Sequence, residues 1–168
     1  MPKHGDTDKN LKKTNAMRAL DAAGISYEFH TLDCGQIEQA PSGVEVAAML
    51  AEDPDRVFKT LVTQGKSGQH YVFMIPAPCE LDLKKAAAVV DEKSVAMVRS
   101  RELLGLTGYV HGGCSPLGMK KPFPTAVDEM AQLHDTVYFS AGRVGAQIEA
   151  SIFDLAQVVD LTFADLTA

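Results

Sequence analysis

The segment VFKTLVTQGKSGQHYVFMI, residues 57–75, decides the fold class of this chain. Two runs rich in β-branched and aromatic residues flank residues 65–68, Gly-Lys-Ser-Gly, a composition typical of a tight turn. The segment therefore predicts a β-hairpin. Because side chains alternate across a strand, Val57, Lys59 and Leu61 share one face, and Lys59 is a cation among apolar neighbours.

Two interpretations of Lys59 stay open at this point. A lysine on an edge strand carries its ammonium to water or discourages pairing with another strand. Alternatively, a partly desolvated ammonium on a rigid strand binds a ligand.

Further along the chain, residues 108–121, GYVHGGCSPLGMKK, use many positions for backbone geometry. Three glycines allow positive φ or close approach of a ligand, and a proline restricts the residue before it. We expect a strand that runs into a shaped loop, with backbone N–H groups directed into a cleft. Lys120 and Lys121 add positive charge suited to a phosphate or carboxylate. An ordinary hairpin loop is the alternative.

A second glycine-containing hairpin is predicted in residues 138–149, YFSAGRVGAQIE. Taken alone it is a weak indication of a site, because such turns are common in hairpins that bind nothing.

The remaining segments predict an α+β fold, with a curved, barrel-like mixed or antiparallel sheet wrapped by helices, because strands outnumber helices and come mostly as hairpins. Residues 33–42 form a polar loop long enough to be a lid. Helices are expected from Leu11 to Gly24 with Thr14 or Asn10 as cap, at 43–51, at 81–91 capped by Asp82, at 99–104 ended by Gly105, and after Ser151; further strands at 25–32, 93–97 and 122–127; and a weak helix or tail up to Ala168.

Length and composition indicate one domain over residues 11–168, preceded by a disordered polar tail at residues 1–10. The formal net charge of −6 argues against tight nucleic-acid binding over a broad surface. Three cysteines without Cys-x-x-Cys spacing suggest neither disulfides nor a zinc ribbon. With no signal peptide or membrane span in the sequence, we expect the cytoplasm.

Several kinds of chemistry find little support in the sequence. The histidines are scattered, so a metal site is not expected. Phosphate-loop and dinucleotide motifs are absent from the sequence. Cys114 and Ser115 lie near His111, but the Gly-x-Ser-x-Gly elbow is missing, and Ser115 precedes a proline. A structural hydroxyl is favoured over a nucleophile.

Five segments together resemble the YbaK/EbsC family of aminoacyl-tRNA deacylases and the related editing domain of bacterial prolyl-tRNA synthetases. They are VFKTL at 57–61, LDLKK at 81–85, TGY at 107–109, GGCSPLGMKK at 112–121 and SAGRVGAQIE at 140–149. The resemblance covers about residues 14–166 in unbroken order. It implies a cytoplasmic enzyme that hydrolyses the ester of mischarged tRNA, most typically Cys-tRNA(Pro), without a metal or other cofactor. The implied partners are the 3′ aminoacyl-adenosine end of tRNA and, as a further candidate, prolyl-tRNA synthetase, with no membrane.

The resemblance also implies the site residues. Catalytic roles fall to Lys59, Gly112, Gly113 and Gly118, and substrate contacts to Thr60, Ser115, Ser140, Gly142, Gly145 and Gln147. Lys59 would lie near the terminal adenosine, and the glycine loop against the aminoacyl carbonyl.

Two departures bear on specificity. Relatives often have a tyrosine where this chain has Leu32, and some have an aspartate where it has Gln147.

A substrate that carries its own thiol explains the missing nucleophile, because intramolecular attack reaches effective molarities of roughly 10⁵ M or more. Substrate-assisted deacylation of Cys-tRNA(Pro) is therefore our prediction. The alternatives are an editing enzyme for Ala-tRNA(Pro) and a non-catalytic module that binds tRNA ends or a synthetase.

Overall fold

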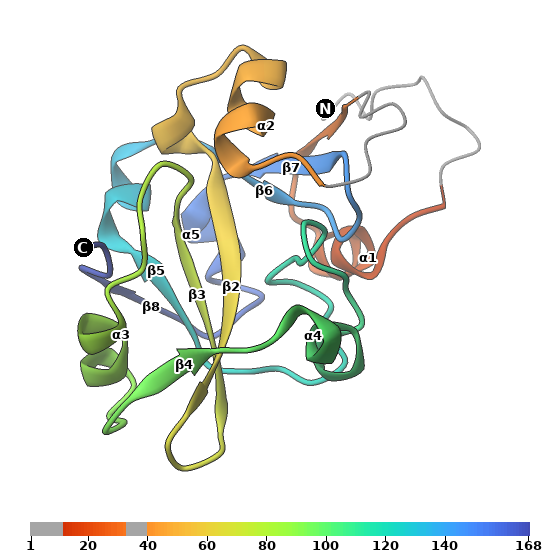
Figure 1. Ribbon diagram of the computed structural model, residues 1–168. Helices are drawn as coiled ribbons and strands as arrows, with labels where there is room; N and C mark the ends of the chain where they lie inside the picture. Colours follow the sequence, from red (N-terminus) through yellow and green to blue (C-terminus); the bar gives the residue numbers. More distant parts are fainter. Residues whose placement is uncertain (1–11, 33–39) are drawn as a thin grey trace.

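A computed structural model describes residues 12–32 and 40–168. Within these residues the chain forms a five-stranded sheet, in the order β4-β2-β3-β5-β8, and a three-stranded sheet, in the order β1-β7-β6 (Figure 1). The strands are β1 (Glu28–Thr31), β2 (Phe58–Gly65), β3 (His70–Pro76), β4 (Val95–Met97), β5 (Thr125–Asp128), β6 (Val137–Ser140), β7 (Ala146–Ala150) and β8 (Leu161–Ala164). The α+β prediction is confirmed. The predicted tail at 1–10 and most of the predicted lid lie outside the described residues.

The predicted hairpins form β2–β3 and β6–β7. In the first, Lys59 lies opposite Ile75 in antiparallel register. β3 is buried along almost its whole length because both its faces are covered. Phe73 and Ile75 pack toward α3 (Leu83–Val89), whereas Met74 packs into the core between the two sheets.

The C-terminal segment differs from the prediction of a weak helix or tail. Residues 161–164 form β8, which pairs in parallel with β5. The run Leu-Thr-Phe-Ala alternates apolar and polar residues, as a strand does. Leu161 and Phe163 pack against the main core, and burial of these side chains outweighs any helical tendency of four residues.

Helix caps agree with the sequence in most places. Thr14 caps α1 (Asn15–Ala22) and Asp82 caps α3. Ser42 begins α2 (Gly43–Leu50) with a capping box, and Ser151 caps the short α5 (Ile152–Leu155). Two 3₁₀ turns, η1 (Pro54–Arg56) and η2 (Glu129–Leu133), complete the described helical segments.

The region after residue 99 needs two corrections. α4 (Ser100–Thr107) passes through Gly105 and ends at Gly108, whose φ of +85° makes it the left-handed cap. The strand predicted from Gly108 does not form. Instead, the Tyr109 hydroxyl donates to the Leu117 carbonyl at 2.6 Å, which fixes the segment as a folded loop.

The two sheets meet at one isolated parallel bridge, between Val57 and Tyr138. The largest core cluster lies between the sheets and includes Phe58, Phe139 and Ile148. The described sheets remain separate and do not close into a barrel. None of the helices in the described ranges is both long enough and apolar enough to span a membrane.

Candidate active site

A cavity of about 480 Å³ opens where the two sheets part. β2 pairs with β3 along one side. On the other side, β4 pairs with it only from Thr63 onward, and the small sheet bridges only to Val57, the residue before β2. Val57 and residues 58–62 of β2 therefore line the cavity. The other walls are the start of α2, the connection from β4 to α4, the turn at 111–114, and Ser140 and Gln147 of β6 and β7.

Five of the ten predicted site residues line this one cavity: Lys59, Thr60, Gly112, Ser140 and Gln147. Lys59 is partly buried, and no carboxylate or hydrogen-bond acceptor of the described residues pairs with its ammonium. An unpaired cation on a rigid strand in a concave site is suited to an anionic or strongly polar ligand.

Two residues that line the cavity each carry a buried side-chain oxygen without a hydrogen-bond partner within the described structure. The two oxygens are Thr60 Oγ1 and Gln147 Oε1, and the Gln147 residue is only 7% exposed. Leaving a buried acceptor unpaired costs about 1–3 kcal/mol, so such groups in a folded protein need an explanation. A ligand that donates hydrogen bonds in the cavity supplies one.

The glycine loop is divided between the cavity and the protein interior. Gly112 has φ +82°, and a Cβ on it would lie 2.3 Å from the Ala40 Cβ, so only glycine fits there. The N–H groups of Gly112 and Cys114, which both line the cavity, donate to no acceptor of the described residues.

Gly113 and Gly118, predicted to contact the substrate, are not among the residues that line this cavity. The Gly113 N–H donates to the Val110 carbonyl at 2.9 Å, and a Cβ on Gly113 would meet the backbone of Arg143 and Val144 at 3.0–3.1 Å. Gly118 has φ +69°, packs on the Asn15 backbone and lines a different cavity. Their geometry is required by close backbone packing, which the spacing of glycines in a sequence does not distinguish from ligand contact.

Three predicted substrate contacts also lie outside the cavity lining. Ser115 is fully buried, and its Oγ accepts from the Leu117 N–H at 3.4 Å. Gly142 packs on the Tyr109 ring with φ +103°, and the Gly145 carbonyl accepts from the Leu32 N–H. These residues shape the turns. Ser140 does line the cavity, where its Oγ accepts from the Gly142 N–H at 3.1 Å.

Cys114 lines the cavity, but its thiol is buried and poorly suited to covalent catalysis. Burial raises the pKa of the Cys114 thiol to about 12, which keeps it protonated near neutral pH. This agrees with the sequence-based prediction that the site has no protein nucleophile.

Some walls of the cavity were not predicted. Ser42, Val44 and Val46 of the α2 segment, and Met97, Val98 and Ser100 of the β4–α4 connection, line it. The exposure of Val44 and Met97, 45% and 47%, marks them as unusual apolar residues, but exposure cannot be read from a sequence.

A polar cluster anchors the strand that carries Gln147. Glu149, two residues further along the same face of β7, accepts from Thr136 at 2.6 Å, contacts His30 Nε2 at 3.1 Å and pairs with Arg56 at 3.5 Å. Burial alone would raise the pKa of Glu149, but the hydrogen bonds from Thr136 and His30 outweigh burial and lower it. The cluster joins η1, at the start of β2, to the small sheet.

The chain is similar to proteins of known description. A family model for an aminoacyl-tRNA editing domain matches residues 37–158. A protein of Enterococcus faecalis (strain ATCC 700802 / V583), named as a Cys-tRNA(Pro)/Cys-tRNA(Cys) deacylase, EbsC, is 40% identical over 159 residues, covering 95% of this chain and 96% of the relative.

Solved structures with the same fold point to the same family. One described as a trans-editing enzyme for prolyl tRNA synthetase superposes with a TM-score of 0.80 at 25% identity, covering 92% of this chain and 95% of that one. The hypothetical protein APE2540 shares the fold, with a TM-score of 0.82 at 23% identity over 92% of this chain and 100% of that one. The chain therefore belongs to the aminoacyl-tRNA editing domain family, which confirms the resemblance to the YbaK/EbsC family and the predicted enzyme class, an aminoacyl-tRNA deacylase.

Proposed function

We propose that this chain hydrolyses the ester of mischarged Cys-tRNA(Pro) in the cytoplasm. The observation that carries the proposal is a single cavity that joins the unpaired Lys59 ammonium, the unpaired buried Gln147 amide oxygen and the free N–H groups of Gly112 and Cys114. The names of the relatives, a Cys-tRNA(Pro)/Cys-tRNA(Cys) deacylase and a trans-editing enzyme for prolyl tRNA synthetase, support the substrate.

In this proposal the protein positions and polarises the substrate, and the substrate supplies the nucleophile. Lys59 holds the terminal phosphate or ribose of the 3′ adenosine. The cysteinyl sulfur attacks its own carbonyl carbon, so that an S–C bond forms as the ester C–O bond breaks. The thiol proton passes to the ribose oxygen, tRNA leaves, and water then opens the thiolactone.

In this proposal the N–H groups of Gly112 and Cys114 stabilise the oxyanion of the attacked carbonyl. Removal of such a donor in other enzymes costs about 2.7–4 kcal/mol of transition-state stabilisation. The oxyanion contact, predicted for the whole Gly112–Gly118 loop, is therefore assigned in this proposal only to the part of the loop that lines the cavity.

Gln147 and Thr60 provide the hydrogen-bonding part of substrate recognition. Gln147 presents an unpaired amide oxygen, which accepts from an ammonium or hydroxyl of the bound aminoacyl-adenosine. Some relatives have an aspartate at this position, and the neutral amide of Gln147 binds the α-amino group of the substrate less strongly than a carboxylate would. Substrate specificity then depends more on the reacting thiol.

A deacylation assay over a panel of tRNA(Pro) species tests the proposal. We expect cleavage of cysteinyl-tRNA(Pro), while seryl- and alanyl-tRNA(Pro), which lack the thiol, persist. A pocket alone discriminates poorly between side chains of such similar size, so a large difference indicates chemistry by the substrate. Equal cleavage of all three would refute the thiol mechanism, and preferential cleavage of alanyl-tRNA(Pro) would make the chain an alanine-editing enzyme.

The proposed partner is the 3′ end of the tRNA, with prolyl-tRNA synthetase as the enzyme that produces the mischarged substrate. Addition of the synthetase to the assay tests the second part. If the two proteins cooperate, the steady-state level of Cys-tRNA(Pro) falls further than separate rates predict.

A further inference from the structure

An open hollow of about 520 Å³ lies beside the active-site cavity, along β4 and the turn of the β2–β3 hairpin. Its lining includes Gln64, Lys66, Met97, Val98, Arg99 and Glu102. Met97 and Val98 line the cavity as well, so the two depressions meet along the β4–α4 connection. A linear ligand whose end is bound in the cavity can therefore continue directly into the hollow.

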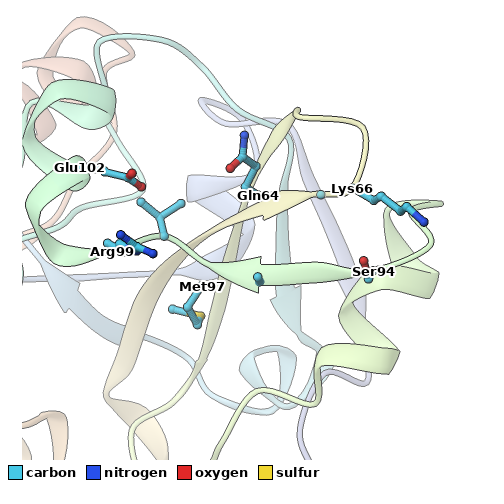
Figure 2. Close-up of a pocket in the computed structure, with 9 residues that line it drawn as sticks. Gln64, Lys66, Ser94, Met97, Arg99 and Glu102 are labelled. Carbon is cyan, nitrogen blue, oxygen red and sulfur yellow. The ribbon is translucent and has the colours of Figure 1, made fainter.

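The hollow carries two cations, Lys66 and Arg99, against one carboxylate, Glu102. Lys66 and Arg99 are exposed, and neither forms an ion pair with any described residue. Figure 2 shows Arg99 at the end of the hollow near α4 and Lys66 at the opposite end, with Gln64 between them. Two cations spread along an elongated surface suit successive charges on one strand better than a single anion.

The start of α4 adds to this field. Arg99 is the N-cap of this eight-residue helix and provides no side-chain acceptor for the first-turn N–H groups. These N–H groups make the end of the helix partly positive. Ser100 faces the cavity and Glu102 the hollow, so the helix end stands at the junction of the two. Glu102 is the one carboxylate among the residues that line the hollow.

We propose that the hollow binds the phosphodiester backbone of the nucleotides that precede the terminal adenosine of the tRNA. This inference rests on the proposed function, which puts that adenosine in the cavity. Basic surfaces that track a single strand bind its phosphates, whereas stacking on bases requires aromatic side chains. None lines the hollow, so the contact is independent of sequence, and local rather than broad, in keeping with a net charge of −6.

Two substrates distinguish the contribution of the hollow from that of the cavity. Cysteinyl-tRNA(Pro) reaches both, whereas 3′-O-cysteinyl-adenosine has no upstream phosphate and reaches only the cavity. In a Lys66→Ala/Arg99→Ala double variant, we expect kcat/KM for the tRNA to fall about tenfold, mainly through KM, and to remain unchanged for the adenosine ester. The salt dependence of the tRNA reaction should become shallower by about 0.7 in log–log slope for each cation removed.

A variant with the opposite sign sharpens the test. Glu102→Gln removes the carboxylate from the hollow, so kcat/KM for the tRNA should rise about two- to threefold with no change for the adenosine ester. Lys84→Ala on α3 is the matched control, because Lys84 is exposed and belongs to neither depression. It should alter neither substrate.

Equal losses on both substrates, or no loss on the tRNA, would overturn the inference. If the wild-type chain cleaves neither substrate, the proposed function fails, and binding decides the inference separately. Fluorescence anisotropy with a labelled, uncharged tRNA(Pro) should then show affinity about tenfold weaker for the double variant than for wild type at low salt. Equal affinities would overturn it on that route.

Discussion

Lys59 combines a cation that has no ion-pair partner among the described residues with a position on a paired strand. Loops bring flexible lysines to ligands at the cost of ordering them. Here the backbone is already fixed by pairing with β3. The residue therefore delivers positive charge to the cavity in nearly the same place each time, which is what alignment of a reacting ester requires.

Replacement of Lys59 by alanine should lower the deacylation rate by about 100-fold or more while the fold persists. A small misplacement of the reacting groups is enough for an effect of this size. Thermal unfolding should show a midpoint close to that of wild type, since Lys59 makes no ion pair with the described residues. Lys84→Ala, with an equal loss of charge, should retain full activity. A fully active Lys59→Ala variant would remove the residue from the site.

Cys114→Ala should leave activity within about threefold of wild type. The pKa of the thiol is raised to about 12 by burial, so little thiolate exists at neutral pH. Loss of the buried sulfur should lower the free energy of unfolding by about 1 kcal/mol, as is usual for core substitutions. An inactive but folded variant, or a rate that rises with pH toward 12 in wild type alone, would indicate covalent catalysis.

At the scale of elements, the turn at 111–114 shows how one glycine serves the cavity while its neighbours serve packing. Gly112 occupies the left-handed region against Ala40 and lines the cavity, and its N–H donates to no acceptor of the described residues. Gly113 and Gly118 have the same residue type but are held against backbone. Replacing Gly112 therefore tests the cavity, whereas replacing Gly113 or Gly118 would first disturb backbone packing.

Gly112→Ala should reduce activity about 100-fold and lower stability by about 1–2 kcal/mol. The substitution places a Cβ 2.3 Å from the Ala40 Cβ and forces a positive φ on a residue that avoids it. Gly105→Ala is the matched control, because that glycine lies inside α4 with open space around it. It should keep full activity and gain about 0.5–1 kcal/mol in stability. Chemical denaturation and the deacylation assay measure both effects.

At the scale of the whole molecule, local pattern and long-range packing explain what the sequence could predict. The β2–β3 hairpin and the cap Asp82 rest on neighbouring residues and were predicted correctly, and of the two caps proposed for the first helix, Thr14 and Asn10, Thr14 is the one that forms. The strand β8 was not, because its partner β5 lies more than 30 residues away in the sequence and an alternation over four residues is too short to exclude a helix.

The prediction of the site residues was likewise correct in part. The resemblance pointed to residues that the fold gathers at one cavity, Lys59, Thr60, Gly112, Ser140 and Gln147. It could not separate glycines that touch a ligand from glycines that touch backbone. Nor could it find Met97, whose place on the rim depends on how the end of β4 meets α4. The catalytic roles of these residues stay predictions.

The cluster around Glu149 ties the small sheet to the start of β2, so its effect should be on stability and its pH dependence. The pKa of Glu149 in the folded protein lies below its ordinary value near 4.5. The ionised carboxylate therefore stabilises the fold above that value, and the stabilisation is lost as pH falls through the folded-state pKa. Glu149→Gln should lower the free energy of unfolding by about 1–3 kcal/mol at pH 7.

Urea unfolding of wild type and Glu149→Gln between pH 3 and pH 7 measures this effect. The difference between the two proteins should shrink as the pH is lowered, because wild type then loses the same charge. Glu80→Gln, at an exposed position away from this cluster, should show no such dependence. A constant difference across the range would mean that the charge of Glu149 is unimportant.

The parting of the sheets along β2 also bears on how easily such a protein acquires a new substrate. The floor of the cavity belongs to a strand embedded in the core, where most substitutions would disturb folding. The rim, in contrast, is formed by Val44 and Met97, which are nearly half exposed and carry little of the fold's stability. Changes of size or polarity there reshape the entrance at small energetic cost, so retargeting toward another aminoacyl group is best begun at those two positions.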